Sequence, residues 1–404
     1  MAATNKGVWD VQEVRDKQLA SEWPYVGGPS ERTAVYTWGL NEMGNLGQNN
    51  TTTRSSPVQV PGVWTNWTFG QQQAYGIKSD GTMWAMGQDS DAGELGQNET
   101  PGASKSSPTQ IGTNTNWKTA VSAKGAVVAV KTDGTIWAWG DNEQGMMGQN
   151  QGGTGPNSRS SPTQIGTDTN WSSDVKRLSA GYRSFYNIKT NGELWVWGFH
   201  GYGALGLNNW DVKISSPAQV GTNTNWSCVD GAVNTTFSVK TDGTLWSCGY
   251  NSDGALGQNE VGVGKHKSSP TQIGTNTNWS LVRAGRYYGV ATKTDGTLWS
   301  WGANENGQLG LGDRQVLSSP TQIPGTWYWV EAGYRTVFGQ KTDGTLWSWG
   351  HNNKGQAGTN NNFANDNGYS SPTQVGTDSD WNIESVSRSG GIDPNVGGAM
   401  RMPS

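Results

Sequence analysis

A chain of 404 residues would ordinarily hold two or three domains, unless it is a repeat array or a closed β structure. Its 59 glycines favour turns and its 23 tryptophans favour strands, so the composition predicts an all-β protein with many tight turns. Charged residues make up only 15% of the chain, the formal charge is −4 and basic runs are absent, which excludes a nucleic-acid partner.

Residues 1–30 precede the first repeat and follow a different pattern. Trp9, Val11 and Val14 contribute to a short apolar stripe at helical spacing, and a linker rich in Pro and Gly follows Trp23. So short a helix is barely stable alone in water, and we expect these side chains to be buried only against a partner. The sequence therefore predicts an N-terminal attachment arm and linker over 1–30, ahead of a separate region that spans 31–404.

The opening KGVWDVQEVRDKQ, followed by a Trp-Pro pair, resembles the N-termini of virion structural proteins from tailed phages, marine ones in particular. The resemblance implies a virion protein whose arm binds other virion proteins or further copies of the chain. The exposed part would then contact a host-surface protein or glycan. The N-terminus lacks the apolar core of a signal peptide, so the expected location without a virion is the cytoplasm. No apolar stretch approaches the roughly 20 residues that span a bilayer, and we expect no membrane insertion.

From about residue 31 onward three short markers recur, each seven times, at intervals of about 50 residues. The tripeptide Ser-Ser-Pro begins at Ser55, Ser106, Ser160, Ser215, Ser268, Ser318 and Ser370. A Trp-Gly pair, with Met or Cys replacing Trp in two units, ends at Gly39, Gly87, Gly140, Gly198, Gly249, Gly302 and Gly350. A Gly-x-x-Gly element begins at Gly44, Gly93, Gly145, Gly203, Gly254, Gly307 and Gly355. The chain therefore contains seven units of one kind.

The sixth unit shows the β pattern within one repeat. Its expected strands are Leu281–Ala284, Gly289–Lys293 and Thr297–Trp301. Asp295-Gly296 between the last two predicts a type I′ hairpin turn. Pro320 in the Ser-Ser-Pro segment cannot donate to a central ladder, so this segment is expected at a sheet edge. Three or four short strands per unit, seven times over, predict the blades of a propeller.

The run WGANENGQLG, from Trp301 to Gly310, resembles the Gly-rich ending of the regulator-of-chromosome-condensation repeat. That family's architecture is a seven-bladed β-propeller, which agrees with the count of units. The first unit supplies only its last strand, Thr33 to Trp38. Trp381 to Ser387 is expected as the first strand of the same blade and Gly398 to Met402 as its second. The N- and C-terminal strands should therefore share a blade and close the ring.

The tryptophans and the tyrosines are expected to have different roles, the first in packing and the second in binding. Strand alternation puts Trp299 and Trp301 on one face of their blade, and we interpret such tryptophans as the packing between blades. Tyr and Arg gather instead in the loops after the first strands. The residues are Tyr182, Arg183, Arg286, Tyr287, Tyr334 and Arg335. Tyr and Arg are enriched in binding hot spots, so these loops are the candidate binding face; alternatively, the side chains only cover the channel mouth. A plant UV-B photoreceptor of the family uses Gly-Trp-Arg-His-Thr segments, and the missing Trp and His argue against light sensing here.

Enzyme signatures are not found. His200, His266 and His351 are isolated, and neither a nucleophile elbow nor a phosphate-binding loop occurs. We expect no catalytic residue, no metal, no cofactor and no enzymatic activity. Cys228 and Cys248 should be free thiols, because a third strand is expected between theirs.

The interpretation favoured by the sequence is a non-enzymatic virion structural protein, an exposed tail or capsid appendage of a tailed phage. A second hypothesis is a cellular protein-binding propeller that acts as an inhibitor or scaffold, since the family contains an inhibitor of β-lactamases. A third is a guanine-nucleotide exchange factor, which is the activity of the family's founding member. The founding member also binds chromatin, and this chain's low, slightly acidic charge does not fit that role.

Overall fold

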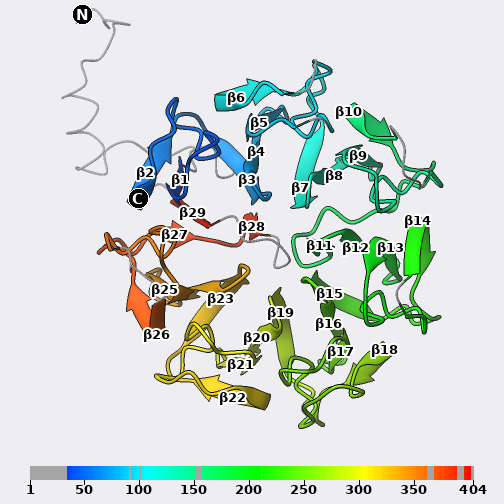
Figure 1. The fold of residues 1–404 in the computed structure, drawn as a ribbon, viewed down its shortest axis with the longest axis vertical. Helices are drawn as coiled ribbons and strands as arrows, with labels where there is room; N and C mark the ends of the chain where they lie inside the picture. The colour runs from blue at the N-terminus through cyan, green and yellow to red at the C-terminus, as the bar shows by residue number, and fades with distance from the viewer. Residues whose placement is uncertain are drawn as a thin grey trace, which may run out of the picture. The chain divides into compact units, whose positions relative to one another are not determined.

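The computed structural model describes residues 34–90, 92–99, 102–151, 157–210, 212–361, 368–388 and 395–401. Within these ranges every regular element is a β-strand, and the strands form seven sheets. Figure 1 shows these sheets as blades around a common centre, which confirms the predicted seven-bladed propeller. The predicted arm, with Trp9, Val11, Val14 and Trp23, lies outside the described residues. In the part of the chain that is described, no helix is long and apolar enough to cross a membrane.

Blades 2 to 7 each use four consecutive strands, which follow one another from the innermost position outward. Blade 2 is β3 (Trp64–Phe69), β4 (Gln73–Lys78), β5 (Met83–Gly87) and β6 (Lys105–Gln110). Blade 3 is β7 (Trp117–Ala123), β8 (Ala126–Lys131), β9 (Ile136–Gly140) and β10 (Arg159–Gln164). Blade 4 is β11 (Leu178–Ala180), β12 (Ser184–Ile188), β13 (Leu194–His200) and β14 (Val212–Gln219).

The remaining three consecutive blades follow the same order. Blade 5 is β15 (Trp226–Gly231), β16 (Thr235–Lys240), β17 (Leu245–Gly249) and β18 (Lys267–Gln272). Blade 6 is β19 (Trp279–Gly285), β20 (Tyr288–Lys293), β21 (Leu298–Gly302) and β22 (Leu317–Ile323). Blade 7 is β23 (Trp327–Ala332), β24 (Thr336–Lys341), β25 (Leu346–His351) and β26 (Gly368–Gln374). The Ser-Ser-Pro segments lie in the outermost strands, as their proline requires. Cys228 and Cys248 are free and lie on β15 and β17, with β16 between them as predicted.

Blade 1 is built from both ends of the propeller, as predicted. From the inside outward it contains β27 (Trp381–Asn382), β29 (Val396–Arg401), β1 (Ala34–Gly39) and β2 (Arg54–Val60). The expectation of one strand from Trp381 to Ser387 is wrong, because β27 ends at Asn382. The chain then turns, and β28 (Val386–Arg388) pairs in parallel with β3 of blade 2. Val386 is completely buried in the hydrophobic cluster between blades 1 and 2, which explains why β28 pairs with the neighbouring blade.

The Asp-Gly hairpin differs from the predicted type I′ turn. The Gly296 N–H donates to the Lys293 carbonyl at 3.0 Å, and the Lys293 N–H donates to the Thr297 carbonyl. Only Gly296 of the loop has a positive φ, at +79°, and Asp295 does not. The loop is therefore a three-residue type I turn with a left-handed glycine. Asp295 accepts hydrogen bonds from the Thr297 N–H and hydroxyl, a role that does not need the mirror-image turn.

The three sequence markers meet at every boundary between blades. The first glycine of each Gly-x-x-Gly element lies against the first serine of Ser-Ser-Pro in the next blade. A Cβ placed on these seven glycines would lie 2.4–2.9 Å from the serine Cα, so no larger residue fits. The inner tryptophan of the next blade donates its indole N–H to a carbonyl of the same glycine element at 2.9–3.0 Å. These tryptophans are Trp38, Trp139, Trp197, Trp301 and Trp349.

The outer tryptophan of each blade has a different role from the one expected. Trp301 is completely buried and packs against Phe237 of blade 5, as predicted for a residue between blades. Trp299, by contrast, remains partly exposed at the rim. It stands beside the hairpin turn, where Lys293 covers it: the ammonium lies 4.2 Å from the centre of Trp299 and 4.7 Å from that of Trp279. Such a cation–π contact contributes about 1 kcal/mol.

The same sandwich of a cation between two aromatic rings recurs in all seven blades. The other cations are Lys78, Lys131, Lys189, Lys240, Lys341 and, in blade 1, Arg401. Burial between the rings lowers the pKa of Lys131 and of Lys240. The lysine that opens each KTDG hairpin is thus a structural residue of the blade.

Candidate functional site

The loops after the first and third strands of each blade open on one face of the ring, because these two strands run in the same direction. We call this the loop face. The loop β11–β12 carries Tyr182 and Arg183, the loop β19–β20 carries Arg286 and Tyr287, and the loop β23–β24 carries Tyr334 and Arg335. All six side chains are half-buried. The structure therefore places the whole predicted set on this one face.

Four of the six predicted residues form one cluster. The Arg286 guanidinium lies over two tyrosine rings, 4.8 Å from the centre of Tyr334 and 5.2 Å from that of Tyr287. Arg335 lies 5.5 Å from the same Tyr334 ring. The Arg286 N–H also donates to the Tyr334 carbonyl at 2.9 Å, which joins the loops of blades 6 and 7. This backbone bond fixes the arginine above both rings.

Tyr182 and Arg183 form a separate group on blade 4. The Tyr182 ring lies under two cations, Arg183 at 5.0 Å and Lys124 of blade 3 at 5.6 Å. Blade 5 stands between this group and the cluster of blades 6 and 7. Its own loop, at residues 232–234, contains neither Tyr nor Arg. The six predicted residues therefore do not make one continuous site.

Three aromatic residues that the sequence analysis did not select extend the larger cluster. Tyr250 lies 4.7 Å from the Tyr287 ring, 5.1 Å from Tyr202 and 5.1 Å from His266, on which it stacks. His266 Nδ1 accepts the Asn251 N–H at 2.9 Å, and burial lowers the pKa of this imidazole. Tyr250 directly follows the Cys-Gly that replaces Trp-Gly in its unit. This departure from the repeat is the one feature of the sequence that could have drawn attention to Tyr250.

Two members of this aromatic track have strained backbones. Nine described residues other than glycine have a positive φ; seven are asparagines, and the others are Tyr202 at +61° and Tyr287 at +60°. A bulky side chain in this region costs of order 1 kcal/mol, and such strain gathers at functional sites. Both strained tyrosines contact Tyr250. The strain therefore points to the same part of the loop face as the ring contacts.

Exposed apolar side chains lie in loops of the same face of the ring as this track. Among the described residues, five of the six large hydrophobic side chains that are exposed lie in the loops after the third strands of blades 4, 5 and 6. They are Tyr202 (42% exposed), Trp210 (53%), Val261 (53%), Val263 (91%) and Val316 (46%). The sixth, Tyr328, lies on β23. Exposed apolar groups gathered on one side of a protein are typical of interaction sites.

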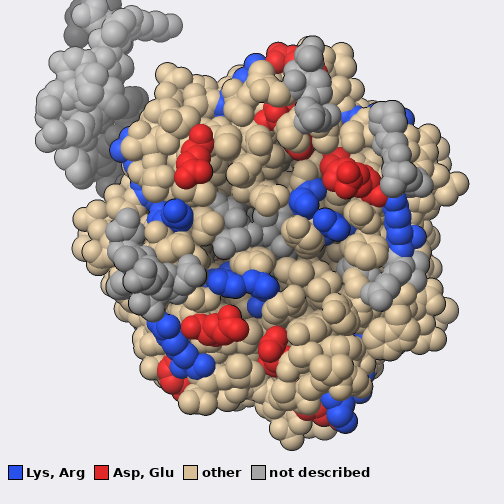
Figure 2. Space-filling model, viewed as in Figure 1, with Lys and Arg blue, Asp and Glu red and all other residues tan. Residues whose placement is uncertain are grey.

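Charge on the ring is sparse and mixed in sign. Figure 2 shows Lys and Arg side chains near the centre of the face in view, with Asp and Glu among and outside them, on a largely uncharged surface. Within the described ranges, no three His, Cys, Asp or Glu residues come close enough to hold a metal ion. The surface offers neither a single-sign field nor a set of metal ligands, and its distinguishing chemistry is aromatic.

The centre of the ring is closed by buried polar side chains that the sequence analysis also missed. Thr68, Ser179, Asp230, Arg283 and Glu331 come from the innermost strands of five blades. They line a cavity of only about 10 Å³, too small for a ligand. Arg283 Nε donates to a Glu331 carboxylate oxygen at 3.0 Å, and both side chains are more than nine-tenths buried.

Asp230 is the third charged group of this centre. It accepts hydrogen bonds from the Ser179 hydroxyl of blade 4 and, at 2.7 Å, from the Ala284 N–H of blade 6. Burial raises its pKa to about 6, against the opposing effect of Arg283 and of these donors. One carboxyl thus joins three consecutive blades at their inner ends.

Comparison with known proteins agrees with this architecture. The model of the RCC1-like domain matches residues 30–339, and that of the regulator of chromosome condensation (RCC1) repeat matches 343–391. The ultraviolet-B receptor UVR8 of Arabidopsis thaliana is 25% identical over 286 residues, which are 69% of this chain and 63% of the receptor. The regulator of chromosome condensation of Xenopus laevis is 26% identical over 310 residues, 72% of each chain. The human ubiquitin ligase HERC2 is 26% identical over 318 residues, but these are only 6% of its length.

Solved structures show the same fold. Prp20p of Saccharomyces cerevisiae superposes with a TM-score of 0.76 at 18% identity, covering 93% of this chain and 92% of its own. Human WBSCR16 also reaches 0.76, at 16% identity, covering 92% and 99%. At sequence identities this low, the similarity shows a shared fold and not a shared function.

Proposed function

Because the chain belongs to the regulator of chromosome condensation (RCC1) repeat family, we propose that it is a non-catalytic propeller that binds another protein through its loop face. The binding region comprises the loops of blades 4 to 7 around Tyr202, Tyr250, Tyr287 and Tyr334. The observation that carries the proposal is the coincidence there of the exposed apolar side chains and the two strained tyrosines. Aromatic residues and arginine dominate the binding energy of protein interfaces.

The relatives support binding of protein partners in general. The structure of yeast Prp20p was described together with its binding to Gsp1p and histones, and another structure shows Kap60 bound to it. Those partners are the yeast protein's own. The photoreceptor similarity brings no light sensing to our proposal, because Tyr182 and Tyr334 replace the tryptophan of the photoreceptor's Gly-Trp-Arg-His-Thr segments and the histidine is missing.

The virion hypothesis rests on the resemblance of the arm, which lies outside the described residues, and on the low charge and the polar, near-identical repeats of the chain. The relatives named for this chain are cellular proteins and give it no support. We therefore propose a protein partner of the cellular kind, such as one that the propeller inhibits or scaffolds. The loop face would serve as the docking surface in either setting.

The proposal is tested by comparing what matched variants retain. Val263→Ser and Tyr287→Gly each remove a side chain from the binding region, while Tyr328→Ser removes an exposed tyrosine from β23. Proteins retained from an extract of the source cells by the wild-type chain are identified by mass spectrometry and purified, and affinities are measured by calorimetry. We expect at least a tenfold loss of affinity for the first two variants and none for the third.

Tyr287→Gly separates binding from folding. Glycine adopts the +60° φ of this position without strain, so the melting temperature should stay level or rise while binding weakens. Equal affinity of all variants for every retained protein would refute the proposed surface.

A further inference from the structure

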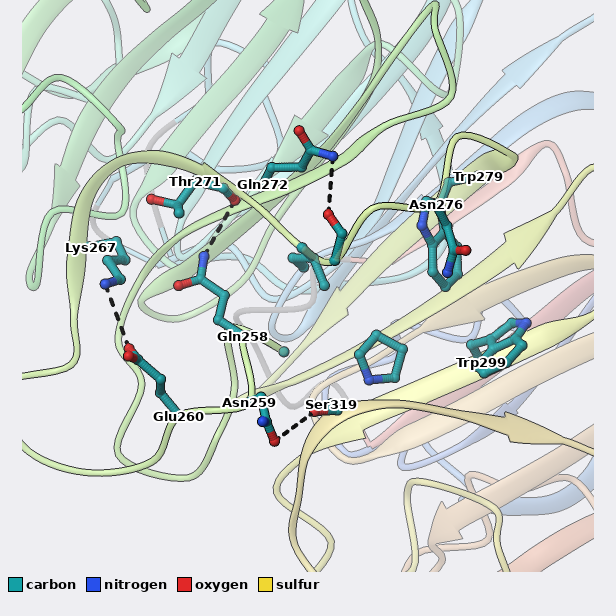
Figure 3. Close-up of a pocket in the computed structure, with 14 residues that line it drawn as sticks. Gln258, Asn259, Glu260, Lys267, Thr271, Gln272, Asn276, Trp279, Trp299 and Ser319 are labelled. Carbon is teal, nitrogen blue, oxygen red and sulfur yellow. Dashed lines mark hydrogen bonds and ion pairs between the residues drawn. The ribbon is translucent and has the colours of Figure 1, made fainter.

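Three equivalent grooves follow one another around the outer rim, where neighbouring blades meet. The groove between blades 3 and 4 has a volume of about 540 Å³, that between blades 4 and 5 about 310 Å³, and that between blades 5 and 6 about 470 Å³. Each contains the two tryptophans of a cation sandwich, the glutamine that ends an outer strand, a left-handed asparagine and the Ser-Pro of the next blade. Figure 3 shows the groove between blades 5 and 6.

The charged groups of these grooves are already paired. Glu260 contacts Lys267 at 3.6 Å in the groove between blades 5 and 6 (Figure 3). Asp168, in the groove between blades 3 and 4, contacts Lys189 at 2.6 Å. What remains for a ligand is uncharged and polar. Gln272, for example, uses its amide nitrogen to donate to the Gly274 carbonyl, which leaves its side-chain oxygen as an acceptor. This lining fits a neutral ligand with hydroxyl groups.

The tryptophans add an apolar surface and a hydrogen-bond donor. Trp299 is partly exposed, and Trp279 meets it edge-on at 6.1 Å. The indole N–H of Trp279 is buried without a hydrogen-bond partner among the described residues, as are those of Trp171 and Trp226 in the other two grooves. Unpaired buried donors are uncommon in folded proteins; they occur at each of these three grooves and also at Trp67, Trp117 and Trp381, which line none of them. Aromatic rings beside a few polar groups are typical of small-ligand sites.

A peptide strand does not fit these grooves. The outer strands that border them contain Pro217, Pro270 and Pro320, which lack the N–H that an added strand would need. A sugar ring meets all the conditions, because its C–H face packs on indole while its hydroxyls bond amides. We propose that the rim grooves bind neutral oligosaccharides, one segment in each groove. This site is separate from the loop face and independent of the protein-binding function proposed for that face.

The test is titration calorimetry of the purified full chain with four neutral hexasaccharides: maltohexaose, cellohexaose, chitohexaose and xylohexaose. We expect at least one to bind with a stoichiometry of three. Trp299→Ala should lower that number to two, and Trp195→Ala with Trp246→Ala and Trp299→Ala should abolish binding. Trp347→Ala, at the same position of blade 7 but outside these grooves, serves as the matched control and should leave the stoichiometry at three.

Thermal unfolding of each variant shows whether the propeller is intact. If Trp299→Ala does not fold, Gln272→Glu replaces it, because this substitution places a charge in the groove between blades 5 and 6 and should also remove one site. Binding of none of the four sugars at millimolar concentration would overturn the proposal. Binding that survives the triple substitution, or binding only of an anionic control such as hexagalacturonate, would overturn it equally.

Discussion

Replacing Arg283 by Met tests whether the buried charges at the centre stabilise the propeller. The substitution leaves the Glu331 carboxylate, whose side chain is 3% exposed, without the Arg283 cation, although the Trp329 indole N–H still donates to it at 2.7 Å. Removing one partner of a buried ion pair costs about 3–5 kcal/mol. The entropy of unfolding for roughly 370 residues is about 0.8 kcal/mol per kelvin, so the melting temperature should fall by about 4–6 °C.

Calorimetry and urea unfolding at pH 7 measure this loss against two controls. Lys105→Met breaks the exposed pair with Glu99 and should cost less than about 1 kcal/mol. The double variant Arg283→Met with Glu331→Met removes both charges and should recover most of the loss, because apolar residues of similar volume replace such pairs well. If Arg283→Met costs no more than Lys105→Met, or if the double variant is as unstable as the single one, the reasoning is refuted.

Three further predictions concern single groups. The pKa of Asp230 is about 6 in the folded state and about 4 in the unfolded state, so between these pH values the folded chain binds one more proton than the unfolded chain. The free energy of unfolding should therefore fall as the pH rises from 4 to 6. Urea titrations of Asp230→Asn should show a weaker dependence on pH. Burial raises the pKa of Asp89, which occupies the position where blade 6 has Asn304, and the Asn304 amide donates to the Asp313 carbonyl at 3.2 Å. Asp89→Asn should therefore stabilise the chain by about 1 kcal/mol at pH 7, and Asn304→Asp should destabilise it. If neither substitution changes the free energy of unfolding, the argument is contradicted. Burial raises the pKa of the Cys248 thiol to about 12 and also raises that of Cys228, so neither should react with Ellman's reagent at pH 8 until the chain is unfolded, and fast reaction of the folded protein would count against their burial.

The repeat made most of the fold predictable. The same contact forms at all seven boundaries between blades, so the residues that make it recur seven times in the sequence. The glycine, serine and tryptophan markers pack against one another at each such boundary. The proline of Ser-Ser-Pro likewise identified the outermost strand. Closure by shared terminal strands followed from the incomplete first unit, because a sheet with a missing strand leaves an open edge.

What escaped prediction depends on contacts that the repeat does not record. The departure of β28 to blade 2 follows from the burial of Val386 against residues more than 300 positions earlier. The aromatic track needs Tyr250 to lie between the loops of neighbouring blades, and the spacing along the chain does not show this. The central charges could have been noticed in the sequence, since Asp230, Arg283 and Glu331 occupy the equivalent position of the innermost strands of blades 5, 6 and 7. That position was the missed signal.

The pairing of β1 with β29 also sets an order of events during synthesis. These strands lie roughly 360 residues apart, so at a translation rate of about 5–20 residues per second β1 leaves the ribosome about 20–70 s before its partner exists. Blades 2 to 7 can each form from contiguous chain in that interval. Throughout it the edge of β1 that will receive β29 stays unpaired, and it is then the segment most open to chaperone binding or to pairing with another nascent chain.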